Sequence, residues 1–189
     1  MQKFYAPENN LSGNIPIQTF GHQQGLIELS LHSNSFTGPI PFELGNLNHL
    51  SILHLQENKL TGEIPMELSG CSALTELILE RNSFYGSIPS FLGSLLSLEI
   101  LDLSNNFFSS TIPPELVNLT FLNTLNLSSN NLSGEVPYIS SQEEGKKVNH
   151  YIPSFAIWLC ASFLWRAASS NKWIFFIQSS WYWKLWLCV

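Results

Sequence analysis

The chain has 189 residues, of which 44% are hydrophobic and 12% are charged, and its formal net charge is −6. An average globular domain carries about 25% charged residues. No cluster of Lys and Arg could neutralise a run of phosphates, so a nucleic-acid partner is excluded. All 14 acidic residues precede residue 145, whereas all six tryptophans follow residue 157, so two kinds of sequence are joined.

The first residues contain part of a repeating pattern. Asn9, Leu11, Gly13 and the pair Ile15-Pro16 form a half unit about one period ahead of the full repeats. The N-terminus has no apolar run of the length found in secretory signals, so no signal peptide is visible. We therefore expect the chain to begin in the middle of a repeat.

A 24-residue unit then recurs five times, up to residue 137. Each unit holds Leu-x-x-Leu-x-Leu, then an Asn, an apolar residue two positions later, and an Ile-Pro or Val-Pro pair. The alternating leucines predict one short strand per unit, and stacking at ~4.8 Å predicts a parallel sheet over a continuous core. The repeated asparagines form a structural ladder at Asn34, Asn58, Asn82, Asn106 and Asn130.

The ladder asparagines and the following glycines have structural explanations. An Asn amide can satisfy buried backbone groups where the chain turns away from the strand. A metal or catalytic role for five stacked asparagines is far less expected. A Gly four positions after the Asn permits a positive φ. Ser110 replaces this Gly in the fourth unit, which predicts a turn that is either strained or differently shaped.

The consensus LxxLxLxxNxLxGxIPxxLGxL resembles the extracellular leucine-rich repeats of plants, and residues 71–137 are similar to the last repeats of receptor-like kinase ectodomains. The resemblance implies a leucine-rich-repeat solenoid, an α/β-type right-handed superhelix with about five repeats and a half repeat. A parallel sheet would form its concave face, and 3-10 or irregular segments its convex side. It also implies a cell-surface module for signalling, defence or development that binds a peptide, a protein or a co-receptor.

Three alternatives remain open. Kinase-less receptor-like proteins and polygalacturonase-inhibiting proteins use the same 24-residue unit, although the latter family carries disulfide caps and about ten repeats. A truncated gene product without independent function is the third reading. No kinase segment, nucleophile motif or phosphate loop is present, so we expect no enzyme activity, no catalytic residue, no metal and no cofactor.

The side chains that point outward from the predicted strands are the candidate binding residues. They form a mixed acidic and polar face with one apolar member, which favours a basic peptide or protein among candidate partners. A solvated sheet face without ligand is an equally weighted alternative. His54 and Asp102 are separated by two strand spacings, too far for an acid–base pair. The candidate residues are Glu28, His54, Gln56, Glu57, Glu76, Ile78, Glu80, Arg81 and Asp102.

Modification and cysteine chemistry give weaker signals. Among four Asn-x-Ser/Thr sequons, Asn118 is the best glycosylation candidate because it falls on the predicted convex side. Three cysteines form no even-numbered framework, and Cys71 is expected to pack as a free thiol. The four sequon asparagines are Asn10, Asn118, Asn126 and Asn131.

The C-terminal part does not follow the repeat. Residues 1–137 are predicted to be the repeat domain, 138–150 a polar linker, and 151–189 a Trp-rich tail with 27 apolar residues. The tail's two apolar runs are short for a helix that spans a bilayer. An interfacial hairpin would allow membrane association through 151–189. Read-through into sequence never selected as protein is the favoured interpretation.

Overall fold

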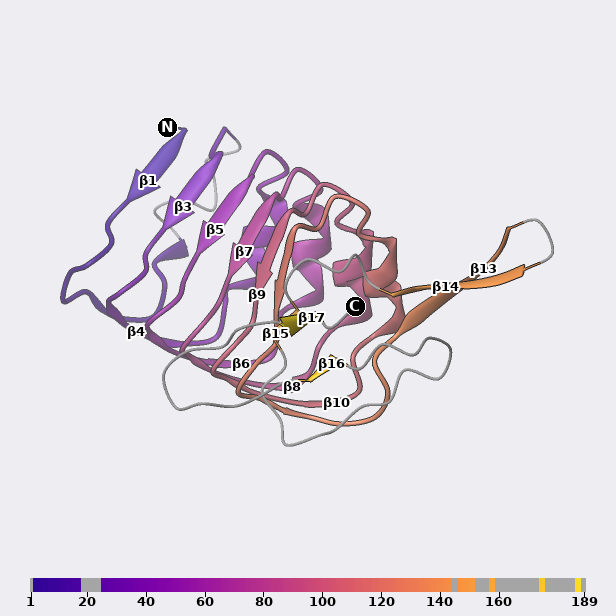
Figure 1. The fold of residues 1–189 in the computed structure, drawn as a ribbon. Coiled ribbons are helices and arrows are strands. Elements are labelled where there is room, and N and C mark those ends of the chain that lie inside the picture. The colour runs from indigo at the N-terminus through magenta and orange to yellow at the C-terminus, as the bar shows by residue number, and fades with distance from the viewer. Residues whose placement is uncertain are drawn as a thin grey trace. The chain divides into compact units, whose positions relative to one another are not determined.

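The computed structural model describes residues 2–17 and 25–137 with their side chains, and only short strands within 138–189. One parallel sheet forms the concave face and contains one strand from every repeat (Figure 1). In spatial order its strands are β1 (Lys3–Tyr5), β3 (Glu28–Ser30), β5 (Ile52–His54), β7 (Glu76–Ile78), β9 (Ile100–Asp102), β11 (Thr124–Asn126) and β15 (Ile157–Trp158). The predicted solenoid is confirmed, and the N-terminal half unit also supplies a strand, β1.

A second parallel sheet follows the ladder asparagines and was not predicted. Its strands are β2 (Ser12–Gly13), β4 (Ser35–Gly38), β6 (Lys59–Gly62), β8 (Ser83–Ser87), β10 (Phe107–Ser110) and β12 (Asn131–Leu132). These strands have two to five residues, too few to reveal themselves by alternation of apolar and polar side chains. Neighbouring strands of this sheet pair with an offset of two positions from equivalent residues of the repeat, as in Thr61 with Ser83 and Tyr85 with Phe107.

Among the described residues, four 3-10 helices cover the convex side, as expected from the resemblance. They are η1 (Phe42–Asn46), η2 (Met66–Gly70), η3 (Ser90–Ser94) and η4 (Pro114–Asn118). Each follows a proline whose φ lies between −63° and −71°, so the Ile-Pro pair brings the chain out of the second sheet in an extended conformation. Each helix buries one leucine against the core.

The core is continuous across the repeats. The middle residue of each concave strand from β3 to β9, such as Leu53 or Leu77, is completely buried and lies in register with its counterpart in the next repeat. Phe84 and Phe108 stack inside the solenoid with ring centroids 6.3 Å apart. This packing removes the leucine face of every strand from water, which no single repeat could do alone.

Two backbone positions per repeat adopt positive φ. The predicted one holds glycine in four of the five full units, and Ser110 adopts a φ of 71° in the remaining unit, which confirms the strained turn. The second was not predicted: the residue before each ladder asparagine has a φ of 52° to 55° and turns the chain out of the concave strand. These corner residues are Ser33, Glu57, Arg81, Asn105 and Ser129.

The C-terminal part is described only as strands. Over residues 138–151, which include the predicted linker 138–150, β13 (Tyr138–Glu143) and β14 (Lys146–Tyr151) pair in antiparallel fashion. Contacts divide the chain into units 1–159 and 160–189, and the second contains the antiparallel strands β16 (Ile174–Phe175) and β17 (Trp186–Leu187). Most of the predicted tail lies outside the described residues. Among those that are described, no helix has the length and apolar character to span a bilayer.

Candidate ligand-binding face

The concave sheet presents two rows of side chains opposite its buried leucines. Cα partners align across the strands, so each row contains one residue from every repeat. The first row contains Glu28, Ile52, Glu76, Ile100 and Thr124, and the second contains Ser30, His54, Ile78, Asp102 and Asn126. The strand period of two therefore exposes every candidate residue on the strands on one face of the sheet.

Five partly exposed residues on β5, β7 and β9 form what we call the central patch: Ile52, His54, Glu76, Ile78 and Ile100. Glu76 lies in register between Ile52 and Ile100, and its Oε2 is 2.8 Å from Nε2 of His54 on the neighbouring strand. A carboxylate among three isoleucines can hold a basic group while the isoleucines contact an apolar neighbour.

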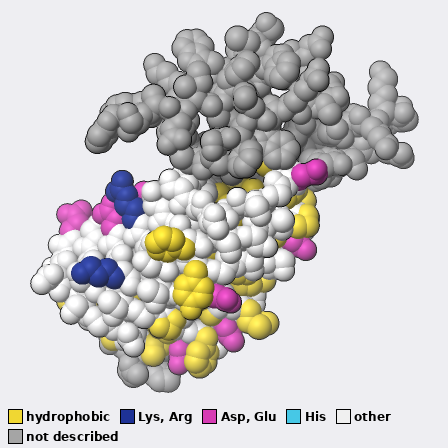
Figure 2. Space-filling model, turned by 90° about the horizontal axis from the view of Figure 1, so that it is seen from below, with side chains coloured by type: hydrophobic (Ala, Val, Ile, Leu, Met, Phe, Trp, Pro, Cys, Tyr) yellow, Lys and Arg dark blue, Asp and Glu magenta, His cyan; other side chains and the backbone are white. Residues whose placement is uncertain are grey.

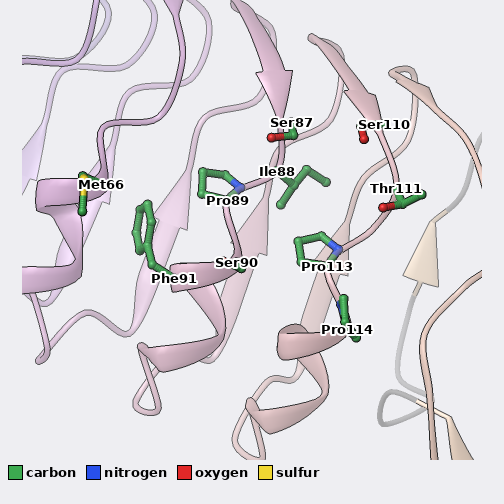
Figure 3. Close-up of a pocket in the computed structure, with 10 residues that line it drawn as sticks. All are labelled: Met66, Ser87, Ile88, Pro89, Ser90, Phe91, Ser110, Thr111, Pro113 and Pro114. Atoms are coloured by element: carbon green, nitrogen blue, oxygen red, sulfur yellow. The ribbon is translucent and has the colours of Figure 1, made fainter.

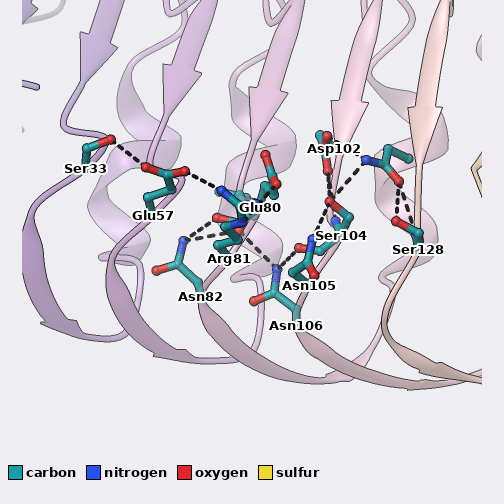
Figure 4. A network of polar contacts seen from close by, with 12 residues as sticks. Ser33, Glu57, Glu80, Arg81, Asn82, Asp102, Ser104, Asn105, Asn106 and Ser128 are labelled. Atoms are coloured by element: carbon teal, nitrogen blue, oxygen red, sulfur yellow. Dashed lines mark hydrogen bonds and ion pairs between the residues drawn. The ribbon is translucent and has the colours of Figure 1, made fainter. Parts of the chain in front are cut away.

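A charged network lies beside the central patch, where the chain leaves the strands (Figure 4). Glu57 accepts a hydrogen bond from Ser33 Oγ at 2.9 Å and one from Arg81 NH1 at 2.7 Å. Arg81 Nε also lies 3.4 Å from Oε1 of Glu80. These corner side chains interact between consecutive repeats because each corner has the same left-handed backbone.

The two carboxylates of this network differ electrostatically. The hydrogen bond from Ser33, followed by the one from Arg81, holds the pKa of Glu57 below its usual value. The pKa of Glu80 is raised, first by burial and then by the nearby carboxylate of Asp102. The acidic face therefore contains one carboxylate, Glu57, whose charged form is stabilised, and another, Glu80, whose charged form a cationic neighbour would stabilise.

Asp102 is held firmly by its own neighbours. Its Oδ1 accepts hydrogen bonds from the backbone N–H and the hydroxyl of Ser104, at 2.9 and 2.6 Å. Its Oδ2 accepts one from Asn126 Nδ2 at 2.9 Å, and Asn126 Oδ1 accepts from the Ser128 hydroxyl at 2.8 Å. Both oxygens of Asp102 and both polar atoms of the Asn126 amide are thus engaged (Figure 4).

The remaining candidates lie apart from the patch or contribute little to it. Glu28 forms an ion pair with Lys3 at 2.8 Å between the first two strands of the sheet. Gln56 Oε1 is buried and accepts no hydrogen bond from the described residues. His54 and Asp102 occupy the same row two strands apart, so they form no acid–base pair.

Sequence reasoning missed the contact between His54 and Glu76. It compared residues of one row, whereas this contact runs diagonally between the two rows of adjacent strands. The signal is a separation of 22 residues, one repeat minus two, and Asn126 contacts Ser104 Oγ at the same separation. Long side chains reach such diagonal partners across a sheet.

The asparagine ladder fixes the spacing of the strands that carry the site. Asn82 Oδ1 accepts a hydrogen bond from the Leu60 N–H of the preceding repeat, at 3.0 Å. Its Nδ2 donates to the carbonyls of Leu55 and Leu79, and Asn106 repeats the pattern one unit further on. Asn9 departs from it, because its amide donates to the Pro7 carbonyl of its own turn.

Cysteine and sequon positions can now be placed. Cys71 is fully buried, its Sγ donates to the Leu44 carbonyl, and burial raises the pKa of its thiol to about 11. Asn10, Asn118 and Asn131 are exposed, unlike Asn126. Among the residues with described side chains, no three His, Cys, Asp or Glu groups converge as metal ligands would.

Comparison with known proteins agrees with this architecture. The leucine-rich repeat family model matches residues 25–47, 49–71, 73–95, 97–119 and 121–142. The chain belongs to the leucine-rich repeat family. A search of curated protein sequences gives no significant match.

Solved structures similar to this chain include plant receptor kinase ectodomains. The Arabidopsis receptor kinase HAESA, solved with the peptide hormone IDA and the co-receptor SERK1, is 47% identical, with a TM-score of 0.70 over 72% of this chain and 23% of the chain in that structure. The ectodomain of the Arabidopsis thaliana receptor kinase GASSHO1/SCHENGEN3, solved with CASPARIAN STRIP INTEGRITY FACTOR 2, is 40% identical (TM-score 0.71; 72% of this chain, 16% of that one).

A shorter structure gives a similar result. Pollen Receptor Kinase 3 is 32% identical, with a TM-score of 0.68 over 72% of this chain and 65% of that protein. The chain thus spans about a fifth of the length of the peptide-receptor structures it resembles.

Proposed function

We propose that this chain is a peptide- or protein-binding module of a plant cell-surface receptor, and that the central patch on its concave face contacts the ligand. The observation that carries the proposal is the placement of Glu76 among three isoleucines, with His54 in contact. The similar receptor ectodomains solved with peptide hormones support this class of function. The module acts by binding and has no catalytic step of its own.

The charge of the face selects the ligand chemistry. Glu57, Glu76, Glu80 and Asp102 supply four carboxylates around the patch, against Arg81, whose guanidinium already contacts two of them. A ligand with Lys or Arg next to an aliphatic or aromatic residue would match both the carboxylates and the isoleucines. A co-receptor that presents such a segment is the alternative partner.

Peptide display tests the proposal. A library of random 12-residue peptides selected on the full-length chain should enrich sequences that place Lys or Arg next to an apolar residue. The Glu76→Lys variant should bind the selected peptides at least tenfold more weakly, because an attraction between Glu76 and the basic residue of the peptide becomes a repulsion. Enrichment of acidic peptides, or unchanged binding by Glu76→Lys, would contradict the proposal.

The matched control is Glu43→Lys, the same charge reversal at a partly exposed residue of η1 on the convex side, outside both proposed sites. It changes the net charge of the chain equally and should leave affinity for the selected peptides unchanged. Equal weakening by both variants would show long-range attraction to an acidic protein without a defined concave site.

A further inference from the structure

The repeats serve as internal controls for one another, and three positions on one flank stand out. Phe91 replaces a residue that is Glu43, Glu67 and Glu115 in the other full units with a 3-10 helix. The other two positions are those of Tyr85 and Phe107, where every other full unit has a polar side chain, namely Ser, Thr, Lys or Asn.

Two of these departures are direct neighbours, and the third lies in the segment that follows one of their strands. Cα partners in β8 and β10 place Tyr85 directly beside Phe107, and the two side chains are 54% and 64% exposed. Phe91 belongs to the same repeat as Tyr85 and lies two residues after Pro89, where the chain has left the second sheet. Ser87 lies on the same face of β8 as Tyr85, because strand side chains alternate with a period of two.

An open pocket of about 570 Å³ lies where β8 and β10, the strands that carry this aromatic pair, end at Ser87 and Ser110 (Figure 3). Its apolar walls come from Met66, Phe91, Pro89, Pro113 and Pro114, contributed by three successive repeats. We call this pocket with Tyr85 and Phe107 the aromatic flank. The volume lies within the range of small ligand pockets.

A strained residue lines the same pocket. Ser110 adopts a φ of 71° where the four other full repeats have glycine, and its side chain lines the pocket beside Thr111. A non-glycine residue in this conformation costs stability. Strain and three aromatic departures therefore coincide on the third and fourth repeats, which is a local signature of a site.

The charges around the aromatic flank are negative. Glu63 lies over Gly86, so that a Cβ added there would be 2.9 Å from its Oε1, and Glu67 and Glu115 adjoin Met66 and Pro114 in sequence. Among the residues with described side chains these three carboxylates have no ion-pair partner.

Basic side chains are scarce on this side of the repeats. Lys3 and Arg81 are paired with Glu28 and Glu57, and Lys59 begins a strand two places away from Phe107. Figure 2 shows a face where hydrophobic side chains gather with acidic ones, whereas the basic side chains lie apart from them.

We propose that the aromatic flank is a second docking site, separate from the concave face, for a basic and apolar segment of a partner protein. Apolar side chains of the partner enter the pocket and stack on Tyr85 and Phe107, while its Lys or Arg residues approach Glu63, Glu67 and Glu115. Charge complementarity selects this partner over an acidic one.

The test uses a 12-residue probe peptide of alternating Lys with Leu and Trp, titrated into the full-length chain. The variant Tyr85→Thr/Phe91→Glu/Phe107→Ser restores residue types found at the same positions of other repeats, so the fold is retained. We expect it to bind the probe at least tenfold more weakly, although it carries one more negative charge. Binding equal to that of the unmodified chain overturns the proposal.

Three controls make the result specific. Phe121→Ser removes an aromatic residue that is 66% exposed outside the flank, and should leave probe affinity unchanged. A probe with Glu in place of Lys should not bind. The tenfold loss should persist in a Glu76→Lys background, which separates this site from the concave face.

Two further outcomes count against the proposal. Loss of binding in Phe121→Ser as large as in the triple variant would show that any exposed aromatic residue suffices. Sedimentation could instead reveal that the unmodified chain self-associates through the flank and that the triple variant is monomeric, with probe affinity unchanged. The occupant would then be a second copy of the chain.

Discussion

Removal of one ladder side chain tests how the repeats are coupled. In Asn82→Ala the buried N–H of Leu60 loses its acceptor, whereas the carbonyls of Leu55 and Leu79 keep donors from Asn58 and Asn106. An orphaned buried donor costs about 1–3 kcal/mol, and the lost amide contacts about 1 kcal/mol more. We therefore expect the free energy of unfolding to fall by about 2–4 kcal/mol.

Asn34→Ala should lower the free energy of unfolding by less. Asn34 accepts its hydrogen bond from the N–H of Leu11, which is exposed and can bond to water instead. Urea unfolding followed by circular dichroism measures the difference between the two variants. Asn48→Ala, at an exposed turn, is the control and should change stability by less than about 0.5 kcal/mol. A cost for Asn82→Ala no greater than that for Asn34→Ala would refute the ladder's role as a buried acceptor.

Three further outcomes follow from the geometry. Ser110→Gly should stabilise the chain by about 0.5–1 kcal/mol, because glycine adopts positive φ freely; a destabilised variant in urea unfolding would contradict this. Glu80→Gln should raise the melting temperature at pH 7. Because the pKa of Glu80 is raised in the folded chain, its ionised carboxylate destabilises the fold, and stability is lost as pH rises through that pKa. The melting temperatures of the unmodified chain and of Glu80→Gln should therefore converge below pH 4. A difference in melting temperature that stays constant with pH would argue against this reasoning. After secretion from plant cells, mass spectrometry should find a glycan at exposed Asn118 and none at Asn126, whose amide is fully engaged; a glycan at Asn126 would disprove that ranking.

The concave sheet was predictable because the sequence repeats every 24 residues with the same Leu-x-Leu pair. A Leu-x-Leu pair every 24 residues determines which residues align, and the observed partners Leu53 and Leu77 follow from that spacing alone. The second sheet was not predictable, because its strands are short and its residues vary from repeat to repeat. Backbone pairing between units, which leaves no side-chain pattern, decides it.

The candidate site was predictable only in outline. The rows were foreseen, and so was the acidic character of the face. The left-handed corner that places Glu57 and Arg81 in contact was missed. The five full repeats have Ser, Glu, Arg, Asn and Ser at this position, so residue type does not indicate the positive φ. The hydrogen bond from Ser104 to Asp102 depends on the rotation of the Ser104 hydroxyl, which cannot be predicted from sequence spacing.

Photo-crosslinking can locate a bound ligand on the molecule, and so can show whether the ligand contacts the concave face. A peptide selected on the full-length chain would carry a benzophenone next to its basic residue, and mass spectrometry would locate the crosslinks. We expect crosslinks in β5, β7 and β9, at the residues of the central patch such as Ile52, Ile78 and Ile100. Crosslinks confined to the convex helices or to residues 151–189 would contradict it.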